Sequence, residues 1–126
     1  MTNMENAVRQ LENLKVWQLS RALVVEIYRV LKDCRDYGFR DQIQRAAVSI
    51  MNNIAEGFES GSDPSFIRYL NISKGSCSEV KSMLYLCVDL KYVDEEVCKN
   101  LQSDVMTIIS GITNFIKYLE SDKKTK

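Results

Sequence analysis

The scarcity of helix-breaking residues is the feature that most constrains the fold of this chain. Its 126 residues contain one proline and five glycines. Proline ends or kinks a helix and glycine weakens it, so this chain favours long helices over many short strands joined by turns. The single proline, Pro64, follows Ser62 and Asp63, and this order is typical of the first turn of a helix.

Apolar residues recur at helical spacing in four segments, and we expect helices over about 14–34, 39–58, 62–91 and 94–120. The predicted core stripes of the first three are Val16, Leu19, Leu23, Ile27, Val30, Leu31 and Cys34; Phe39, Ile43, Ala46, Ala47, Ile50, Ile54 and Phe58; and Phe66, Tyr69, Leu70, Ser73, Cys77, Val80, Leu84, Cys87 and Val88. The last segment has the clearest pattern, a seam with steps of three and four formed by Val97, Leu101, Val105, Ile108, Ile112, Phe115 and Leu119. Four amphipathic helices with short connections predict an all-α, antiparallel up-down-up-down four-helix bundle. We expect one domain over residues 1–126, with 1–13 and 121–126 flexible.

Two glycines lead to more local expectations. Asp36, Tyr37 and Gly38 are expected to form the first turn, with Gly38 in the left-handed conformation. Gly75 falls in the middle of the third helix, where glycine costs about 1 kcal/mol relative to alanine. We interpret it as a site where a neighbouring element packs closely or where the helix bends.

The composition argues against several classes of function. The 17 basic and 17 acidic residues balance, so nucleic-acid binding would need a local basic patch. The chain has no histidine, and its four cysteines form no CxxC pair. We therefore expect no enzyme activity, no cofactor and no metal, and we keep a carboxylate metal enzyme as a minor alternative. Without a signal peptide or an apolar run of about 20 residues, we expect a cytoplasmic protein without membrane contact.

A polar stripe follows one flank of the second predicted helix. It contains Gln42, Arg45, Ser49, Asn52, Asn53 and Glu56. These side chains could form a ligand or partner site, or they could form a hydrogen-bonded seam against another helix or another subunit. We favour the seam, because polar groups in such positions fix the register between helices.

Basic residues lie near aromatic residues in two places, which suggests contacts with phosphates and bases. Arg21, Lys32 and Arg35 share a stripe of the first helix with Tyr28, flanked by Trp17. Lys74 and Lys81 align with Tyr85 on the third helix. The candidate nucleic-acid contacts are Arg21, Lys32, Arg35, Arg45, Lys74 and Lys81. The alternative interpretation is a solvated face at the edge of the core.

More apolar residues are present than a four-helix monomer needs for its core. Those outside the core stripes are Val25, Val48, Ala55, Ile67, Leu86 and Leu90. Exposed apolar patches often mark subunit contacts, so we expect a homo-oligomer.

Three stretches together resemble a known family. They are LKVWQ at 14–18, QIQRAAVSIMNNIAEG at 42–57 and FIRYLNISKGS at 66–76. Over about residues 12–120 the chain resembles the four-helix bundle family of 23S rRNA intervening-sequence proteins, also labelled S23 ribosomal proteins. It is also similar to the accessory variability protein of diversity-generating retroelements.

The resemblance implies a homopentamer without enzyme activity. Its signature positions correspond to Trp17, Ser49, Asn53, Glu56, Gly75, Ser76 and Glu79. With Gln42, these residues are our candidates for the polar seam or interface. We therefore predict a non-enzymatic, oligomeric scaffold or binding module whose partner, besides copies of itself, is RNA or protein. The alternative is a retroelement accessory protein that binds a reverse transcriptase and nucleic acid.

Overall fold

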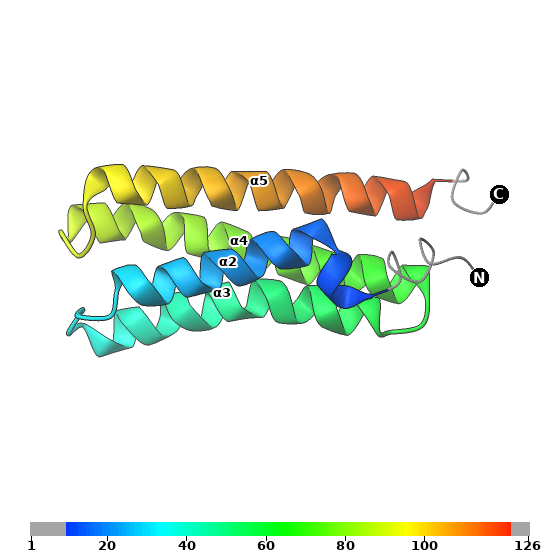
Figure 1. Ribbon diagram of the computed structural model, residues 1–126, viewed down its shortest axis with the longest axis horizontal. Helices are drawn as coiled ribbons and strands as arrows, with labels where there is room; N and C mark the ends of the chain where they lie inside the picture. The colour runs from blue at the N-terminus through cyan, green and yellow to red at the C-terminus, as the bar shows by residue number, and fades with distance from the viewer. Residues whose placement is uncertain (1–9, 122–126) are drawn as a thin grey trace.

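Four long helices follow one another in the computed structural model, which describes residues 10–121. They are α2 (Lys15–Val30), α3 (Tyr37–Phe58), α4 (Asp63–Asp89) and α5 (Glu95–Glu120), preceded by one 3₁₀ turn, η1 (Leu11–Asn13). Figure 1 shows that successive helices run in opposite directions. Each helix packs against its neighbours in sequence, and α2 also packs against α5, which closes the ring. The predicted four-helix bundle is confirmed.

The core of the bundle contains the apolar stripes that defined the four helices. Its largest fully buried side chains are Leu23, Ile27, Leu31, Ile43, Ile50, Ile54, Leu70, Val80, Leu84, Val105, Ile108 and Ile112. Each was on a predicted core stripe. All four helices contribute to this list, so none of them can bury its apolar face without the others.

Side-chain caps begin three of the helices. Ser62 accepts a hydrogen bond from the Ser65 backbone N–H at 3.3 Å, and Pro64 follows in the first turn of α4, as the sequence predicted. Asp36 caps α3 by accepting from the Phe39 N–H. Asp94 caps α5 by accepting from the Glu96 N–H. Each cap satisfies a backbone donor that has no partner within its helix.

The first helix ends earlier than the apolar pattern suggested. α2 ends at Val30, and a turn follows, although the prediction extended the helix to Cys34. Leu31 is nevertheless buried and Cys34 half-buried. The chain turns while its apolar side chains stay in contact with the core. The apolar periodicity therefore predicted correctly which residues are buried, but it overestimated the length of the helix.

The prediction of a left-handed Gly38 is also wrong, because this residue lies inside the first turn of α3. Positive φ angles occur within residues 10–121 at Gly61 (87°) and Lys91 (61°). Lys91 follows the end of α4, where the Lys91 N–H bonds the Val88 carbonyl and the Tyr92 N–H bonds the Cys87 carbonyl. This pair of bonds is a Schellman motif, in which glycine is the usual left-handed residue.

Close helix packing occurs at a different glycine from the one we expected. A Cβ atom on Gly75 would meet nothing within 4 Å, so no neighbour in the subunit requires this glycine. A Cβ atom on Gly57 would lie 2.7 Å from Phe66 Cδ1 and 2.9 Å from Tyr69 Cβ. Gly57 is therefore the residue that lets α3 and α4 approach each other near the loop that joins them.

The terminal predictions fall largely outside the described part of the chain. Leu11–Asn13 form η1, and Ser121 is the C-cap of α5, whereas residues 1–9 and 122–126 lie outside the described residues. Within residues 10–121, no helix combines the length and apolar character that crossing a bilayer requires.

Candidate functional site

The inner edge of the polar stripe on α3 forms hydrogen bonds with α4. Ser76 Oγ donates to Ser49 Oγ at 2.9 Å, which joins the two helices at mid-length. Asn53 Nδ2 donates to the carbonyl oxygen and the Oγ of Ser49, both at 2.9 Å. Ser49 is therefore the centre of a small polar network between α3 and α4. This part of the stripe has the geometry of a seam within the subunit.

Two further bonds extend this seam along the helices. Gln42 Nε2 donates to Glu79 Oε2 at 3.4 Å near the start of α3. Ser73, which is fully buried, donates from Oγ to the Ile50 carbonyl oxygen at 2.8 Å. A buried hydroxyl without a partner would cost about 1–3 kcal/mol, so this bond favours one register between α3 and α4.

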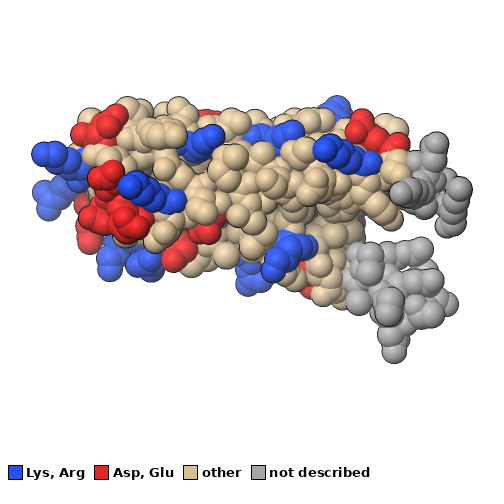
Figure 2. Space-filling model, turned by 90° about the horizontal axis from the view of Figure 1, so that it is seen from above, with Lys and Arg blue, Asp and Glu red and all other residues tan. Residues whose placement is uncertain are grey.

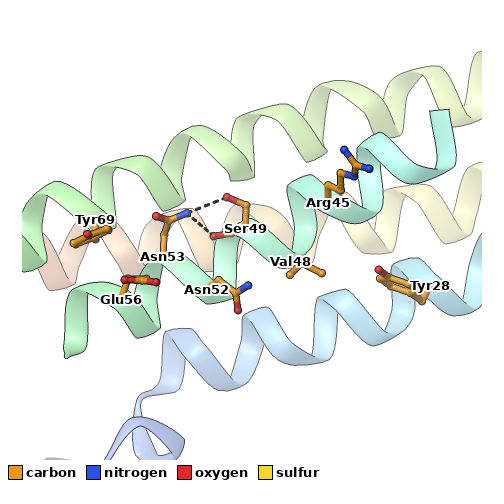
Figure 3. A pocket seen from close by; sticks show the side chains of 8 residues that line it. All are labelled: Tyr28, Arg45, Val48, Ser49, Asn52, Asn53, Glu56 and Tyr69. Atoms are coloured by element: carbon orange, nitrogen blue, oxygen red, sulfur yellow. Dashed lines mark hydrogen bonds between the residues drawn. The ribbon is translucent and has the colours of Figure 1, made fainter. Parts of the chain in front are cut away.

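The outer edge of the same stripe lies open to solvent. Arg45, Asn52 and Glu56 are exposed, and they line an open groove of about 590 Å³. Figure 3 shows Tyr28 of α2 near the Arg45 end of this groove and Tyr69 of α4 near the Glu56 end. The full lining is Tyr28, Arg45, Val48, Ser49, Asn52, Asn53, Glu56 and Tyr69. We call this surface the α3 groove.

A second hollow of about 580 Å³ continues the α3 groove towards the start of α3. The two share Arg45 and Ser49, and Glu79 of α4 contributes to the second. The polar stripe therefore has two edges with different roles. Its inner edge holds α4 in register, and its outer edge presents a cation, amides and an anion to whatever approaches.

The three buried thiols of the bundle are poorly suited to nucleophilic chemistry. Burial raises the pKa of Cys77 and the pKa of Cys87 to about 12, and it also raises the pKa of Cys98. A thiol with so high a pKa carries almost no thiolate at neutral pH. In residues 10–121, no three His, Cys, Asp or Glu side chains are grouped so that they could hold a metal ion.

The candidate nucleic-acid contacts are spread over four parts of the structure. Arg21 is exposed on α2, and its guanidinium lies 5.6 Å from the centre of the Trp17 ring. Lys32 and Arg35 lie in the connection after α2, so the predicted helical stripe with Arg21 is interrupted. Arg45 belongs to the α3 groove, which places it apart from Lys74 and Lys81 on α4.

The eight candidates for the polar seam or interface fall into two groups. Ser49, Asn53, Ser76, Gln42 and Glu79 are brought together by the bonds between α3 and α4. The other three are not part of that network. Glu56 lies in the α3 groove, Trp17 is half-buried on α2, and Gly75 is exposed on α4.

Sequence reasoning missed two contributors to this region. Tyr69 was assigned to the core stripe of α4, and its side chain lines the α3 groove. Ser73 was also assigned to that stripe, but the sequence did not predict the hydrogen bond that its buried hydroxyl donates to the Ile50 carbonyl oxygen. Helical periodicity locates both residues on the inner side of α4, and it carries no signal that separates a core position from a groove edge.

Comparison with known proteins assigns the chain to a family. A crystal structure of a protein of unknown function from the S23 ribosomal protein family of Bacteroides thetaiotaomicron is similar, with a TM-score of 0.76 and 27% sequence identity. The match covers 81% of this chain and 98% of that one. No curated protein matches the sequence. The family model described as 23S rRNA-intervening sequence protein matches residues 12–114, and the chain therefore belongs to this family.

Proposed function

We propose that this protein is a non-enzymatic scaffold that assembles with copies of itself, and that the face formed by α3 and α4 is where one copy docks on the next. The observation that carries the proposal is a stripe along the outside of α4. It consists of Arg68, Ile72, Gly75, Glu79, Leu86 and Leu90, separated by steps of four, three, four, seven and four residues. We call it the α4 outer stripe.

The spacing of the α4 outer stripe is that of a helix seam that contacts another helix. Ile72, Leu86 and Leu90 are 44%, 45% and 47% exposed, although α4 already has a separate buried stripe towards the core. Gly75 lies between them with open space at its Cβ position. A glycine there would let the backbone of a neighbouring helix come close. The stripe thus has the character of an interface that is uncovered in the single subunit.

The charges of this face support a second copy as the occupant. Arg45 and Glu56 on α3 are 11 residues apart, about 16 Å along the helix. Arg68 and Glu79 on α4 have the same order and separation. If α3 of one copy lies antiparallel to α4 of another, each cation faces an anion. None of these four residues forms an ion pair within residues 10–121. Glu79 accepts a hydrogen bond from Gln42, and the Arg68 guanidinium lies 4.5 Å from the centre of the Tyr69 ring, so all four charges still lack an opposite charge.

A cyclic assembly is consistent with two different surfaces in contact. A ring of more than two subunits needs a heterologous interface, in which one patch of each subunit contacts a different patch of the next. The α3 groove and the α4 outer stripe are two different patches, as such an interface requires. The homopentamer that the family resemblance implies is the assembly that we propose.

We place this scaffold in the cytoplasm. Its four cysteines are free, and three of them are buried, which suits a reducing compartment. The partner beyond the assembly itself is proposed to be RNA or protein. The reverse-transcriptase alternative stays a prediction from the sequence.

The test is the mass of the purified protein by size-exclusion chromatography with light scattering. We expect about five times the 14.5 kDa of the subunit. Leu86→Glu and Ile72→Glu each place a charge in the α4 outer stripe, and both variants should elute as monomers with unchanged helical circular dichroism. Since both side chains are already partly exposed, the subunit should still fold.

Val25→Glu is the matched control. Val25 is 61% exposed on α2, so the variant adds the same charge at an apolar surface residue outside the α3–α4 face. It should keep the wild-type mass. A wild-type protein of 14.5 kDa at high concentration would refute self-assembly, and dissociation by Val25→Glu alone would refute the choice of face.

A further inference from the structure

The opposite flank of α4 presents lysines rather than apolar residues. Lys74, Ser78, Lys81 and Tyr85 are separated by four, three and four residues, so they lie on one face of the helix. Their flank is not the one that contacts α3, because Ser76 and Glu79 face α3 through hydrogen bonds. The lysine flank therefore lies on the α5 side of α4.

A matching stripe lies on α5. Lys99, Met106, Ser110, Thr113 and Lys117 are separated by seven, four, three and four residues. The other flank of α5 faces α2, because Asp104, Thr107 and Ile108 share a hollow with Leu19, Ala22, Leu23 and Glu26 of α2. The stripe with the two lysines is thus on the α4 side of α5. The two stripes together form one surface, which we call the lysine face.

The antiparallel register of α4 and α5 determines where these lysines lie along the long axis of the bundle. The rings of Phe66 and Phe115 are 5.1 Å apart, so the start of α4 lies beside the end of α5. Lys74 is consequently level with about Thr107 in the middle of α5, and Lys81 is level with about Asn100, so both lie between Lys99 and Lys117 along the bundle. The two α5 lysines are 18 residues apart, which is about 27 Å. The result is a row of four positive charges.

Acidic side chains occur only at the two ends of this row. Within α4 and α5, Glu79 is turned towards α3 and Asp104 towards α2. The other acids of α4, α5 and their connection are Asp89, Asp94, Glu95 and Glu96 at one end and Asp63 and Glu120 at the other. Lys99 is 3.8 Å from Glu95, whereas Lys74, Lys81 and Lys117 have no ion pair in the described chain. Figure 2, which looks down onto α5, shows blue side chains spaced along the tan surface.

The chemistry of the lysine face fits the backbone of a single-stranded nucleic acid. Lysines neutralise phosphates, the hydroxyls of Ser110 and Thr113 can donate to phosphate oxygens, and Tyr85, which is 58% exposed, offers a ring for base stacking. A membrane-binding helix would add large apolar side chains to the lysines. Only Met106 is an exposed aliphatic residue here.

We propose that the lysine face binds single-stranded RNA through Lys74, Lys81, Lys117 and Tyr85. The whole protein has no net charge, so the attraction is local to this row. This proposal does not rest on self-assembly, because the α4 outer stripe and the lysine face are different flanks of α4.

The test is fluorescence anisotropy with a labelled oligouridine RNA of about 20 nucleotides, over a range of salt concentrations. Wild-type binding should weaken with salt, with a logarithmic slope of roughly −2 to −3 for three or four phosphate contacts. The triple variant Lys74→Glu, Lys81→Glu and Lys117→Glu should bind at least about tenfold more weakly at low salt. Its mass in solution should not change.

The matched control is Arg21→Glu, Lys32→Glu and Arg35→Glu, which changes the net charge by the same amount on the α2 side. It should retain most of the affinity. Equal loss in both triple variants, or no RNA binding by the wild type at low salt, would overturn the proposal. The glutamine triple Lys74→Gln, Lys81→Gln and Lys117→Gln provides the same comparison if the charge reversals unfold the protein.

Two further probes identify the ligand chemistry. Tyr85→Ala should weaken RNA binding about fivefold or more and leave binding of inorganic polyphosphate, which has no bases, unchanged. Binding of phosphatidylserine vesicles in the absence of RNA binding would show a membrane surface as the partner and contradict the proposal.

Discussion

Replacing Gly57 by alanine should destabilise the bundle, although alanine is the better helix former. The new Cβ atom would lie 2.7 Å from Phe66 Cδ1 and 2.9 Å from Tyr69 Cβ. Carbon atoms in contact are normally about 3.5–4.0 Å apart. The Phe66 ring can rotate or shift, but the Tyr69 Cβ atom is fixed to the backbone of α4. The two helices must therefore separate at this point.

The magnitude follows from two opposing contributions. Overpacking of a well-packed site costs about 1–3 kcal/mol. Alanine also increases the free energy of unfolding by up to about 1 kcal/mol, because it restricts the unfolded chain and favours the helix. We expect a net decrease of about 1–2 kcal/mol in the free energy of unfolding, or roughly 4 °C in melting temperature per kcal/mol for a chain of this size.

Urea denaturation followed by circular dichroism measures this change in the monomeric Leu86→Glu background, with Gly75→Ala as the control. Gly75 is also inside a helix, but its Cβ position is open, so alanine there should stabilise the isolated subunit by about 1 kcal/mol. A double-mutant cycle with Phe66→Leu isolates the overlap, since the smaller side chain should cost less in the Gly57→Ala variant than in the wild type. An unchanged or increased stability of Gly57→Ala would refute the reasoning.

Three other properties follow from the structure. Lys91→Gly should raise the free energy of unfolding by about 1 kcal/mol in the same urea assay, because Lys91 has a φ of 61° at the end of α4. A small thiol reagent should react readily with Cys34, which is half-buried, and with the other three cysteines only after unfolding, as a count of labelled thiols by mass spectrometry would show. The hydrogen bond from Tyr92 to Asp36 raises the pKa of Tyr92 from 10.0 to about 12, so its stabilising contribution is complete below pH 10 and is lost as the pH rises towards 12. Tyr92→Phe should remove that part of the alkaline loss of stability.

The helices and the core could be predicted from the sequence because both depend on local periodicity. The buried side chains Ile43, Ile50 and Ile54 of α3 were all on the predicted stripe. The length of α2 could not be predicted in the same way. Leu31 remains buried after the helix has ended, so an apolar pattern continues through a turn and looks like a helix.

The roles of the glycines depend on tertiary structure, which explains why the sequence did not identify Gly57 as the glycine of the α3–α4 contact. Gly57 and Gly75 both lie within helices, and nothing in the local sequence tells which one faces a neighbouring helix. Only the approach of Phe66 and Tyr69 to Gly57 decides the matter. Lys91 is a related case, since nothing in the sequence indicates that this lysine adopts the left-handed conformation.

The polar stripe shows where sequence reasoning about the site reached its limit. The interpretation as a seam describes Ser49 and Asn53, which bond across or along the α3–α4 contact. The interpretation as an open partner site describes Arg45 and Glu56, which line the α3 groove. A helical wheel places all four residues on one flank. The position of α4, which covers only half of that flank, separates the two groups.

We predict that the two flanks of α4 link the proposed assembly to the proposed RNA binding through avidity. If the α4 outer stripe is buried between subunits, the lysine face remains open and is repeated once in each copy of the ring. A long RNA can then contact several copies, whereas a short oligonucleotide contacts one. Linked sites can increase apparent affinity by about 10²–10⁴. Leu86→Glu should therefore weaken binding of a long RNA by about tenfold or more while hardly changing the affinity for a short one. Competition experiments with RNAs of both lengths measure this difference, and equal effects on both lengths would show that assembly and RNA binding are not linked through α4.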